Sequence, residues 1–397
     1  AHNFSTVLKT KALSSQPELG DAFYNSFDFP KIQLRRQGVI DRLQRGLLSL
    51  FKNLKINFIE GEASFVSDKE IKVNGQTIAF DAAIVAAGTK AFFPPPFNQY
   101  QDKLHDNSTI FNLQKVPARL AIIGGGVIGC EFACMFNAFG CKVTIIEMMP
   151  SIIPFEDEAV VRVLKSSLEK RGVEIKNGVC AKDVKFNGDI KTIMLDNGET
   201  VEAEEVLVAV GRAVDLTSLN LDAVGISWDR KGIKVADTKT LKVKDNIYAV
   251  GDVNGLTLLA HAATAQGEVA AKNIMGVEAA YNNDMVPKAI YTWPEVSSIG
   301  ITKKEAETKG IEAKVYKTFM MANGRALTQD ATEGFVQLVG DAKTDKILGA
   351  QMVGPGVSEL IHIPQMAMLA GYKVKELEEV IFAHPSLSEA IREAAAK

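Results

Sequence analysis

Cysteine is scarce in this chain, which contains only four in 397 residues. These are Cys130, Cys134, Cys141 and Cys180. They are too few and too irregularly spaced for the disulfide framework of a secreted protein. The sequence therefore favours a reducing compartment, either the cytoplasm or, in a eukaryote, the mitochondrial matrix.

Long apolar runs and a strong charge bias are also missing. The longest nearly uncharged stretch, residues 120–141, contains Glu131 and several glycines, so it suits a buried strand and turn better than a membrane span. The formal charge is −3 and no cluster of four or more Lys or Arg residues occurs, which argues against nucleic acid or an anionic membrane as partner. The length exceeds what one hydrophobic core supports, so we expect two or three globular domains.

Glycine, in contrast, is concentrated in RLAIIGGGVIGCEF, residues 119–132. An apolar strand runs into Gly124-x-Gly126-x-x-Gly129, and a helical segment follows. The first glycine permits a tight turn, the second lets backbone approach a pyrophosphate, and the third lets helix and strand pack closely. We expect a dinucleotide site that includes Ile128; the alternative is a tight strand-to-helix turn without a ligand.

The next predicted strand, KVTIIE, ends in Glu147, 23 residues after Gly124. A carboxylate at this position accepts hydrogen bonds from both ribose hydroxyls and repels a 2′-phosphate. No Lys or Arg occurs in the following MMPSIIP. The sequence therefore predicts NAD rather than NADP.

Two segments, residues 70–89 and 192–211, share one plan. In each, a strand meets an Asn-Gly turn, a return strand follows, and an apolar strand ends in Ala-x-Gly. This predicts a duplicated domain, with chance as the alternative because Asn-Gly hairpins are frequent. Asn197 lies 73 residues after Gly124. Counting the same 73 residues back from Asn74 leads to the first residue of the sequence. We therefore expect the first copy's phosphate-binding turn at or before the start of this sequence.

Nine stretches occur in one order: AAGT, IIGGGVIGCEF, VAVGR, IYAVGD, LLAHAATAQG, YTWPEVSSIGIT, MANGRA, ILGAQMVGP and AHPSLSE. Together they resemble the flavoprotein disulfide reductases, also called class I pyridine nucleotide-disulfide oxidoreductases, and most closely the dihydrolipoamide dehydrogenase branch. The resemblance implies an α/β fold with two Rossmann-like nucleotide-binding domains, the first incomplete and discontinuous. A C-terminal α+β interface domain that forms a homodimer would follow. The implied domains are residues 1–117 with 240–282 for FAD, 118–239 for NAD, and 283–397 for the interface.

The resemblance also implies the flavin-binding residues. Asp252 in AVGD matches the carboxylate that binds the FAD ribityl chain, Gly251 allows close approach, and Ala260 begins a helix whose amides face the flavin ring. An ordinary turn residue is the alternative for Asp252. Gly88 matches a backbone turn near FAD, and Gly211 matches the segment that closes over NAD. Both glycines also fit plain strand-terminal turns.

Near the C-terminus, His384-Pro-Ser-Leu-Ser-Glu389 resembles the family's acid/base dyad. A histidine can take a proton from a thiol near neutral pH, and a carboxylate can fix its tautomer. The alternative is a helix capping box from Ser386 to Glu389, with Pro385 near the helix start. Phe382 departs from the family, which has a histidine there.

The family's electron relay, a Cys-x4-Cys disulfide, is missing from the sequence. Cys130 and Cys134 lie one helical turn apart, and we predict packing rather than a redox or metal role, because no further ligand stands at a useful spacing. VLKTKALSSQ weakly resembles the end of the relay motif. In that register Lys11 matches a lysine that lies by the flavin and pairs with a glutamate matching Glu131; a solvated N-terminal charge is the alternative.

Three functional hypotheses remain open. The first is an incomplete form of an FAD- and NAD-dependent enzyme, which oxidises a dihydrolipoyl group on a protein of a 2-oxoacid dehydrogenase-type complex. The second is a relative that lost the relay and acts as a nucleotide-binding or assembly subunit. The third is another NADH-dependent flavin reductase or oxidase. None of them requires a metal.

Overall fold

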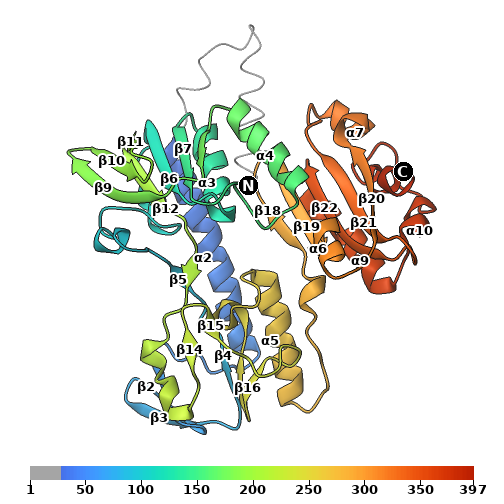
Figure 1. Cartoon of the computed structure of the whole chain (residues 1–397). Helices are drawn as coiled ribbons and strands as arrows, with labels where there is room; N and C mark the ends of the chain where they lie inside the picture. Colours follow the sequence, from blue (N-terminus) through green and yellow to red (C-terminus); the bar gives the residue numbers. More distant parts are fainter. Residues whose placement is uncertain (1–27) are drawn as a thin grey trace. The chain divides into compact units, whose positions relative to one another are not determined.

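The computed structural model describes residues 28–397, which form two compact units (Figure 1). In the described part of the chain, unit 1 comprises residues 93–211 and 284–397, and unit 2 comprises residues 28–92 and 212–283. Each unit therefore joins stretches that are distant in the sequence. The domain boundaries implied by the resemblance remain a prediction.

Unit 1 contains a parallel sheet around the glycine-rich segment. Its order is β12 (Glu205–Val208), β6 (Arg119–Ile123), β7 (Lys142–Glu147) and β8 (Glu174–Asn177), with α3 (Val127–Ala138) and α4 (Glu158–Lys170) between strands. Strand β6 is buried from Leu120 to Ile123. Its continuous apolar run is typical of a parallel strand covered on both faces.

The predicted duplication appears as two matching three-stranded antiparallel sheets. They are β1 (Ala63–Ser67), β2 (Glu70–Val73) and β3 (Gln76–Ala79) in unit 2, and β9 (Ala181–Asn187), β10 (Ile190–Leu195) and β11 (Thr200–Ala203) in unit 1. Asn74 and Gly75 have φ values of 50° and 80°, as a type I′ turn requires. At the second turn Gly198 has a positive φ but Asn197 does not, so this Asn-Gly turn is not of type I′.

Unit 2 also contains the strand that follows the first hairpin. Here β4 (Ala83–Val85) pairs in parallel with β17 (Ile247–Ala249), and β16 (Lys242–Lys244) flanks β17. This pairing joins residues more than 150 positions apart and confirms the discontinuity predicted for the first domain. The remaining elements are α2 (Phe29–Asn53), β5 (Lys90–Ala91), β13 (Arg212–Ala213), β14 (Trp228–Asp229), β15 (Gly232–Ile233) and α5 (Ala260–Ile274).

The C-terminal part of unit 1 is the predicted α+β unit. An antiparallel sheet has the order β18 (Lys288–Ile290), β19 (Glu295–Gly300), β22 (Ile347–Gly354), β21 (Phe335–Asp341) and β20 (Ala313–Phe319). The helices are α6 (Lys303–Thr308), α7 (Gly324–Thr328), α8 (Val357–Leu360), α9 (His362–Ala370), α10 (Val374–Glu378) and α11 (Glu389–Ala395). The core of this part includes Leu338 and Met352 of the sheet and Ile391 of α11.

Between residues 28 and 397, no helix combines the length and apolar character that crossing a membrane requires.

Candidate active site

The glycine loop joins β6 to α3, and two of its glycines are fixed by close packing. Gly124 has a φ of 109°, and a Cβ there would lie 2.5 Å from the carbonyl oxygen of Ala209. A Cβ on Gly129 would collide with the carbonyl oxygen of Gly124. Glycine is therefore required at both positions by the backbone itself.

Gly126 is different, because nothing lies within 4 Å of the place its Cβ would occupy. It is the N-cap of α3, and its φ of −74° is open to any residue. Ile128, in the first turn of α3, is half-buried. An open backbone at the start of a 12-residue helix fits the approach of a pyrophosphate, which the free amides and the helix dipole stabilise.

Glu147 ends β7 and is only 7% exposed. Its Oε2 accepts a hydrogen bond from the Gly125 amide at 2.5 Å, and its Oε1 accepts one from the Met149 amide at 2.7 Å. The carboxylate thus anchors both the glycine loop and the segment after β7. The sequence predicted the position of this acid but not its bonds to the backbone. Each oxygen keeps a lone pair for the predicted ribose contact.

Removing the Glu147 carboxylate should weaken NADH binding and narrow the preference for NADH over NADPH. In Glu147→Ala two amides lose their acceptor, at about 1–3 kcal/mol for a buried donor such as the Gly125 amide, so we expect NADH affinity to fall about tenfold or more. Titration of NADH and NADPH by fluorescence measures both effects. Glu169→Ala, at an exposed position of α4, is the control. An unchanged NADH-to-NADPH ratio in Glu147→Ala would count against the assigned role.

The two cysteines of α3 lie in the protein interior. Burial raises the pKa of the Cys130 thiol well above its usual value and that of Cys134 to about 12. The Sγ of Cys134 accepts a hydrogen bond from the Trp293 amide at 3.4 Å. Both thiols are therefore protonated at neutral pH, which agrees with packing and not with thiolate chemistry. Within residues 28–397, no three His, Cys, Asp or Glu side chains form a group that could hold a metal ion.

Glu131 lies between these cysteines on α3. Its Oε1 accepts a hydrogen bond from the Tyr291 amide at 2.8 Å, and burial raises the pKa of its carboxyl group. The partner expected for it, Lys11, lies outside the described residues. Glu131 thus links α3 to the segment before β19.

In unit 2 the structure brings together residues from three of the sequence motifs. The Thr89 hydroxyl donates to Oδ2 of Asp252 at 2.8 Å, and Nε of Arg212 donates to the Thr89 hydroxyl oxygen at 2.7 Å. The guanidinium of Arg212 also lies 3.9 Å from Asp252. Gly88 and Gly251 beside them have φ values of 64° and 75°. AAGT, VAVGR and AVGD therefore meet at one place, and the roles of Thr89 and Arg212 there were not predicted.

A second group of residues in unit 2 holds the segment that carries Asp252 in place by hydrogen bonds. Gln266 is fully buried on α5, the helix that begins at Ala260 as predicted. Its Oε1 accepts from the Gly251 amide at 2.7 Å and from Nδ2 of Asn254 at 2.8 Å. Its Nε2 has no hydrogen-bond partner in the described part of the chain. These contacts fix the turn that presents Asp252 and leave a buried donor, which fits a polar ligand in this unit.

Gly211 ends the segment VAVG in unit 1. Its φ is 131°, and no atom lies within 4 Å of a Cβ built there. The backbone at this point is therefore open to a ligand. Closure of this segment over NAD remains a prediction.

His384 and Glu389 form a hydrogen-bonded pair. Nδ1 of His384 lies 2.9 Å from Oε1 of Glu389, and the histidine side chain is 79% exposed. Oε2 of Glu389 accepts from the Ser386 amide at 2.8 Å; this bond, followed by the contact with His384, lowers the pKa of the Glu389 carboxyl group. The capping box of the alternative is half formed: the Ser386 amide donates to Glu389, but the Ser386 hydroxyl bonds to that of Ser388, and α11 begins at Glu389 without a side-chain cap.

Comparison with known proteins covers nearly the whole chain. Residues 2–267 match the family described as "Pyridine nucleotide-disulphide oxidoreductase", and residues 286–395 match its dimerisation domain. Dihydrolipoyl dehydrogenase 2 of Haloarcula marismortui is 36% identical over 372 residues, or 91% of this chain and 79% of that protein. The dihydrolipoyl dehydrogenase of Thermus scotoductus is 34% identical over 391 residues, or 96% of this chain and 82% of that protein.

Two solved structures share the fold. LpdA from Mycobacterium tuberculosis has a TM-score of 0.89 at 25% identity, covering 99% of this chain and 88% of that one. The HOCl-induced flavoprotein disulfide reductase RclA from Escherichia coli has a TM-score of 0.86 at 27% identity, covering 94% and 86%.

Proposed function

The chain belongs to the pyridine nucleotide-disulphide oxidoreductase family, and we propose that it oxidises a dihydrolipoyl group carried by another protein and reduces NAD. The family makes it an oxidoreductase that uses FAD and NAD(H), with an α/β fold of two Rossmann-type domains and a dimerisation domain. The matched dimerisation domain supports a homodimer. The scarcity of cysteine supports a reducing compartment, the cytoplasm or, in a eukaryote, the mitochondrial matrix.

The pair formed by the exposed His384 and the half-buried Glu389 is the observation that carries this proposal. A dithiol titrates above neutral pH, so its oxidation needs a base that removes a thiol proton. Glu389 holds Nδ1 of His384 at 2.9 Å and leaves Nε2 of this exposed histidine for the approaching dihydrolipoyl group. The carboxylate also stabilises the imidazolium that forms when Nε2 takes the proton.

The cofactor-binding residues fit two dinucleotides. Gly124, Gly126 and Gly129 would hold the NAD pyrophosphate at the start of α3, with Glu147 at the ribose. Asp252, Gly251, Gly88 and Ala260 would hold FAD in unit 2, where the turn at Asp252 is fixed and a buried amide donor is left over. When bound, FAD and NAD supply the two-electron carriers that no side chain of this chain provides.

The absent Cys-x4-Cys pair leads to a specific expectation for this 397-residue chain. When supplied with FAD, it should reduce an artificial dye with NADH but fail to reduce lipoamide, because the step between dithiol and flavin needs the relay. Parallel assays with lipoamide and with dye measure the difference. Robust lipoamide turnover by this chain would refute our account of the missing cysteines.

A nucleotide-binding or assembly subunit is the second candidate, and the lack of a relay pair in the sequence is the observation that favours it. This candidate predicts NADH binding without dye reduction. An NADH oxidase would instead consume oxygen rapidly in the same assay. The three outcomes therefore separate the three hypotheses.

A further inference from the structure

A hollow of about 500 Å³ lies in unit 1 between one face of α4 and the adjacent ends of β20 and β21. Arg162, Ser166 and Lys170 line it at the spacing of one helical face, and Lys317, Phe319 and Phe335 line the opposite side. None of the lining residues belongs to the glycine loop or to the His384 pair. Its volume is in the range of small-molecule sites.

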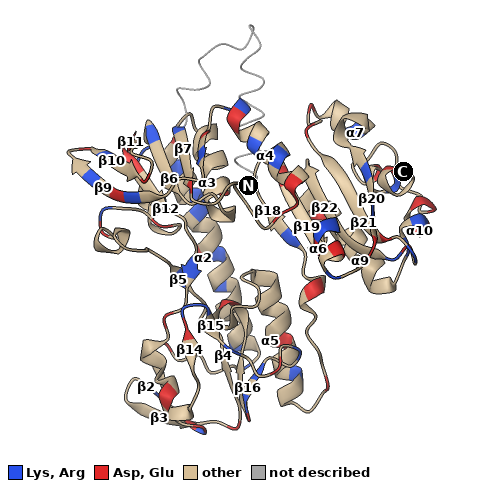
Figure 2. Cartoon of the chain, viewed as in Figure 1, with Lys and Arg blue, Asp and Glu red and all other residues tan. Residues whose placement is uncertain are grey.

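The cations around this hollow are unpaired. Arg162, Lys170 and Lys317 form no ion pair within residues 28–397, whereas Lys165 on another face of α4 pairs with Glu169 at 3.8 Å. Figure 2 shows both basic and acidic residues along α4. Burial lowers the pKa of the Lys317 ammonium; nearby Asp157 opposes this, and Arg162 acts in the same direction as burial. Arg162 and Lys317 thus repel each other, and the acid that acts on Lys317, Asp157, forms no ion pair with it within residues 28–397.

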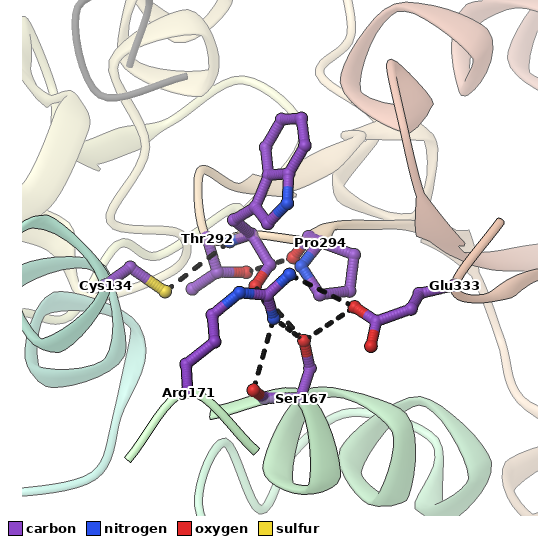
Figure 3. A network of polar contacts seen from close by, with 7 residues as sticks. Cys134, Ser167, Arg171, Thr292, Pro294 and Glu333 are labelled. Carbon is purple, nitrogen blue, oxygen red and sulfur yellow. Dashed lines mark hydrogen bonds and ion pairs between the residues drawn. The ribbon is translucent and has the colours of Figure 1, made fainter. Parts of the chain in front are cut away.

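The acidic residue of the hollow does not neutralise these cations. Oε2 of Glu333 accepts from the Ser167 hydroxyl at 2.8 Å and lies 3.3 Å from Nη2 of Arg171 (Figure 3). Arg171 also donates to the Trp293 carbonyl at 3.3 Å. The charge of Glu333 is therefore matched by Arg171, a residue that does not line the hollow, and the hollow keeps an excess of positive charge.

Aromatic rings form the apolar part of the hollow. Nζ of Lys317 lies 3.4 Å from the ring centroid of Phe335 and 5.5 Å from that of Phe319. Phe335 is buried, whereas Phe319 is 54% exposed. A flat ring of a ligand can stack on Phe319 beside the ammonium group.

We propose that this hollow binds a nucleoside phosphate as a second nucleotide site, separate from the glycine loop. The phosphate would lie between Arg162 and Lys317, where it relieves the repulsion of two like charges, and the Ser166 hydroxyl or Lys170 would bind further oxygens. The base would stack on Phe319. An inorganic anion satisfies the cations but leaves the ring uncovered.

Lysine acetylation of the full chain tests this site, read by mass spectrometry with ADP as the probe. At an ADP concentration tenfold above its dissociation constant, acetylation of Lys170 and Lys317 should slow by about tenfold. Lys165 on the same helix should react at an unchanged rate and serves as the internal control. Acetylation of Lys170 and Lys317 that ADP does not slow would overturn the proposal.

Variants and a second probe identify what is recognised. Arg162→Gln should weaken protection by ADP about tenfold, the effect of losing one charge-assisted hydrogen bond. Phe319→Ala should weaken protection by ADP but not by pyrophosphate. Equal protection by pyrophosphate and ADP would overturn the nucleotide assignment in favour of an inorganic anion. Protection that disappears in Gly126→Ala would mean that ADP acts from the glycine loop, which also contradicts the proposal.

Discussion

Replacing Gly126 with alanine should weaken NADH binding by about tenfold or more, while the melting temperature stays the same. A methyl group at this open position meets no protein atom within 4 Å, so the folded chain loses nothing. It does occupy the space through which the pyrophosphate reaches the backbone amides of α3. The loss of one charge-assisted hydrogen bond accounts for the tenfold figure. Fluorescence titration with NADH and thermal melts followed by circular dichroism measure the two quantities.

Gly129→Ala is the matched variant, and both quantities should fall in it. Its methyl group collides with the Gly124 carbonyl oxygen, which cannot move without shifting β6 or α3. Such overpacking lowers the free energy of unfolding by about 1–3 kcal/mol. Wild-type NADH affinity in Gly126→Ala, or wild-type stability in Gly129→Ala, would contradict the division of roles within the loop.

His384→Gln should lower turnover driven by a dithiol by roughly 10²- to 10⁴-fold, the usual contribution of a general base. The variant keeps a polar side chain of similar size but cannot take the proton. NADH-to-dye reduction should be unchanged, because no thiol proton is involved. The comparison requires a form of the protein that carries the Cys-x4-Cys pair.

His362→Gln is the control for this prediction. His362 is also exposed, and its Nδ1 lies 2.8 Å from Oε1 of Gln365, but it belongs to α9 and has no carboxylate partner in the described part of the chain. It should retain both activities. Equal losses in His362→Gln and His384→Gln, or a loss of dye reduction in His384→Gln, would remove the basis for a proton-transfer role.

The Glu389→Gln substitution should lower the free energy of unfolding at pH 7, and this difference from wild type should disappear in acid. The pKa of Glu389 lies below its usual value of 4.5, because the Ser386 amide and His384 stabilise the carboxylate. A carboxyl group whose pKa is lowered by folding adds stability above its unfolded pKa, and this stability disappears as the pH falls through the folded pKa. Denaturant unfolding at several pH values measures the difference from wild type. A difference that is independent of pH would mean that charge is not the cause.

The glycine loop could be predicted from sequence because its constraints are local. Gly129 is required by a backbone contact within one strand–turn–helix unit, and Gly124 has a positive φ in the same turn. An apolar strand before them and a helix after them are visible in the sequence. The position of Glu147 followed in the same way. Its bonds to Gly125 and Met149 could not be predicted, since they depend on how two loops approach each other.

Side-chain contacts between distant segments could not be predicted from the sequence. Thr89, Arg212 and Asp252 each stand beside a glycine that the motifs singled out, yet Arg212 and Thr89 are separated by 123 residues. Only the packing of β4 beside β17, and of β5 beside β13, brings them together. The Asn-Gly hairpins show that a local motif can also mislead. The two identical dipeptides form different turns, because the loops that contain them differ in length.

The most direct test of the central claim is anaerobic mixing of the FAD-supplied chain with NADH, followed by flavin absorbance. We expect the flavin absorbance to bleach with NADH, and much more slowly with NADPH or with the Gly126→Ala variant. Flavin that stays oxidised while NADH saturates the protein would contradict a path between the two cofactors. Equal rates with NADH and NADPH would contradict the role of Glu147 in choosing between them.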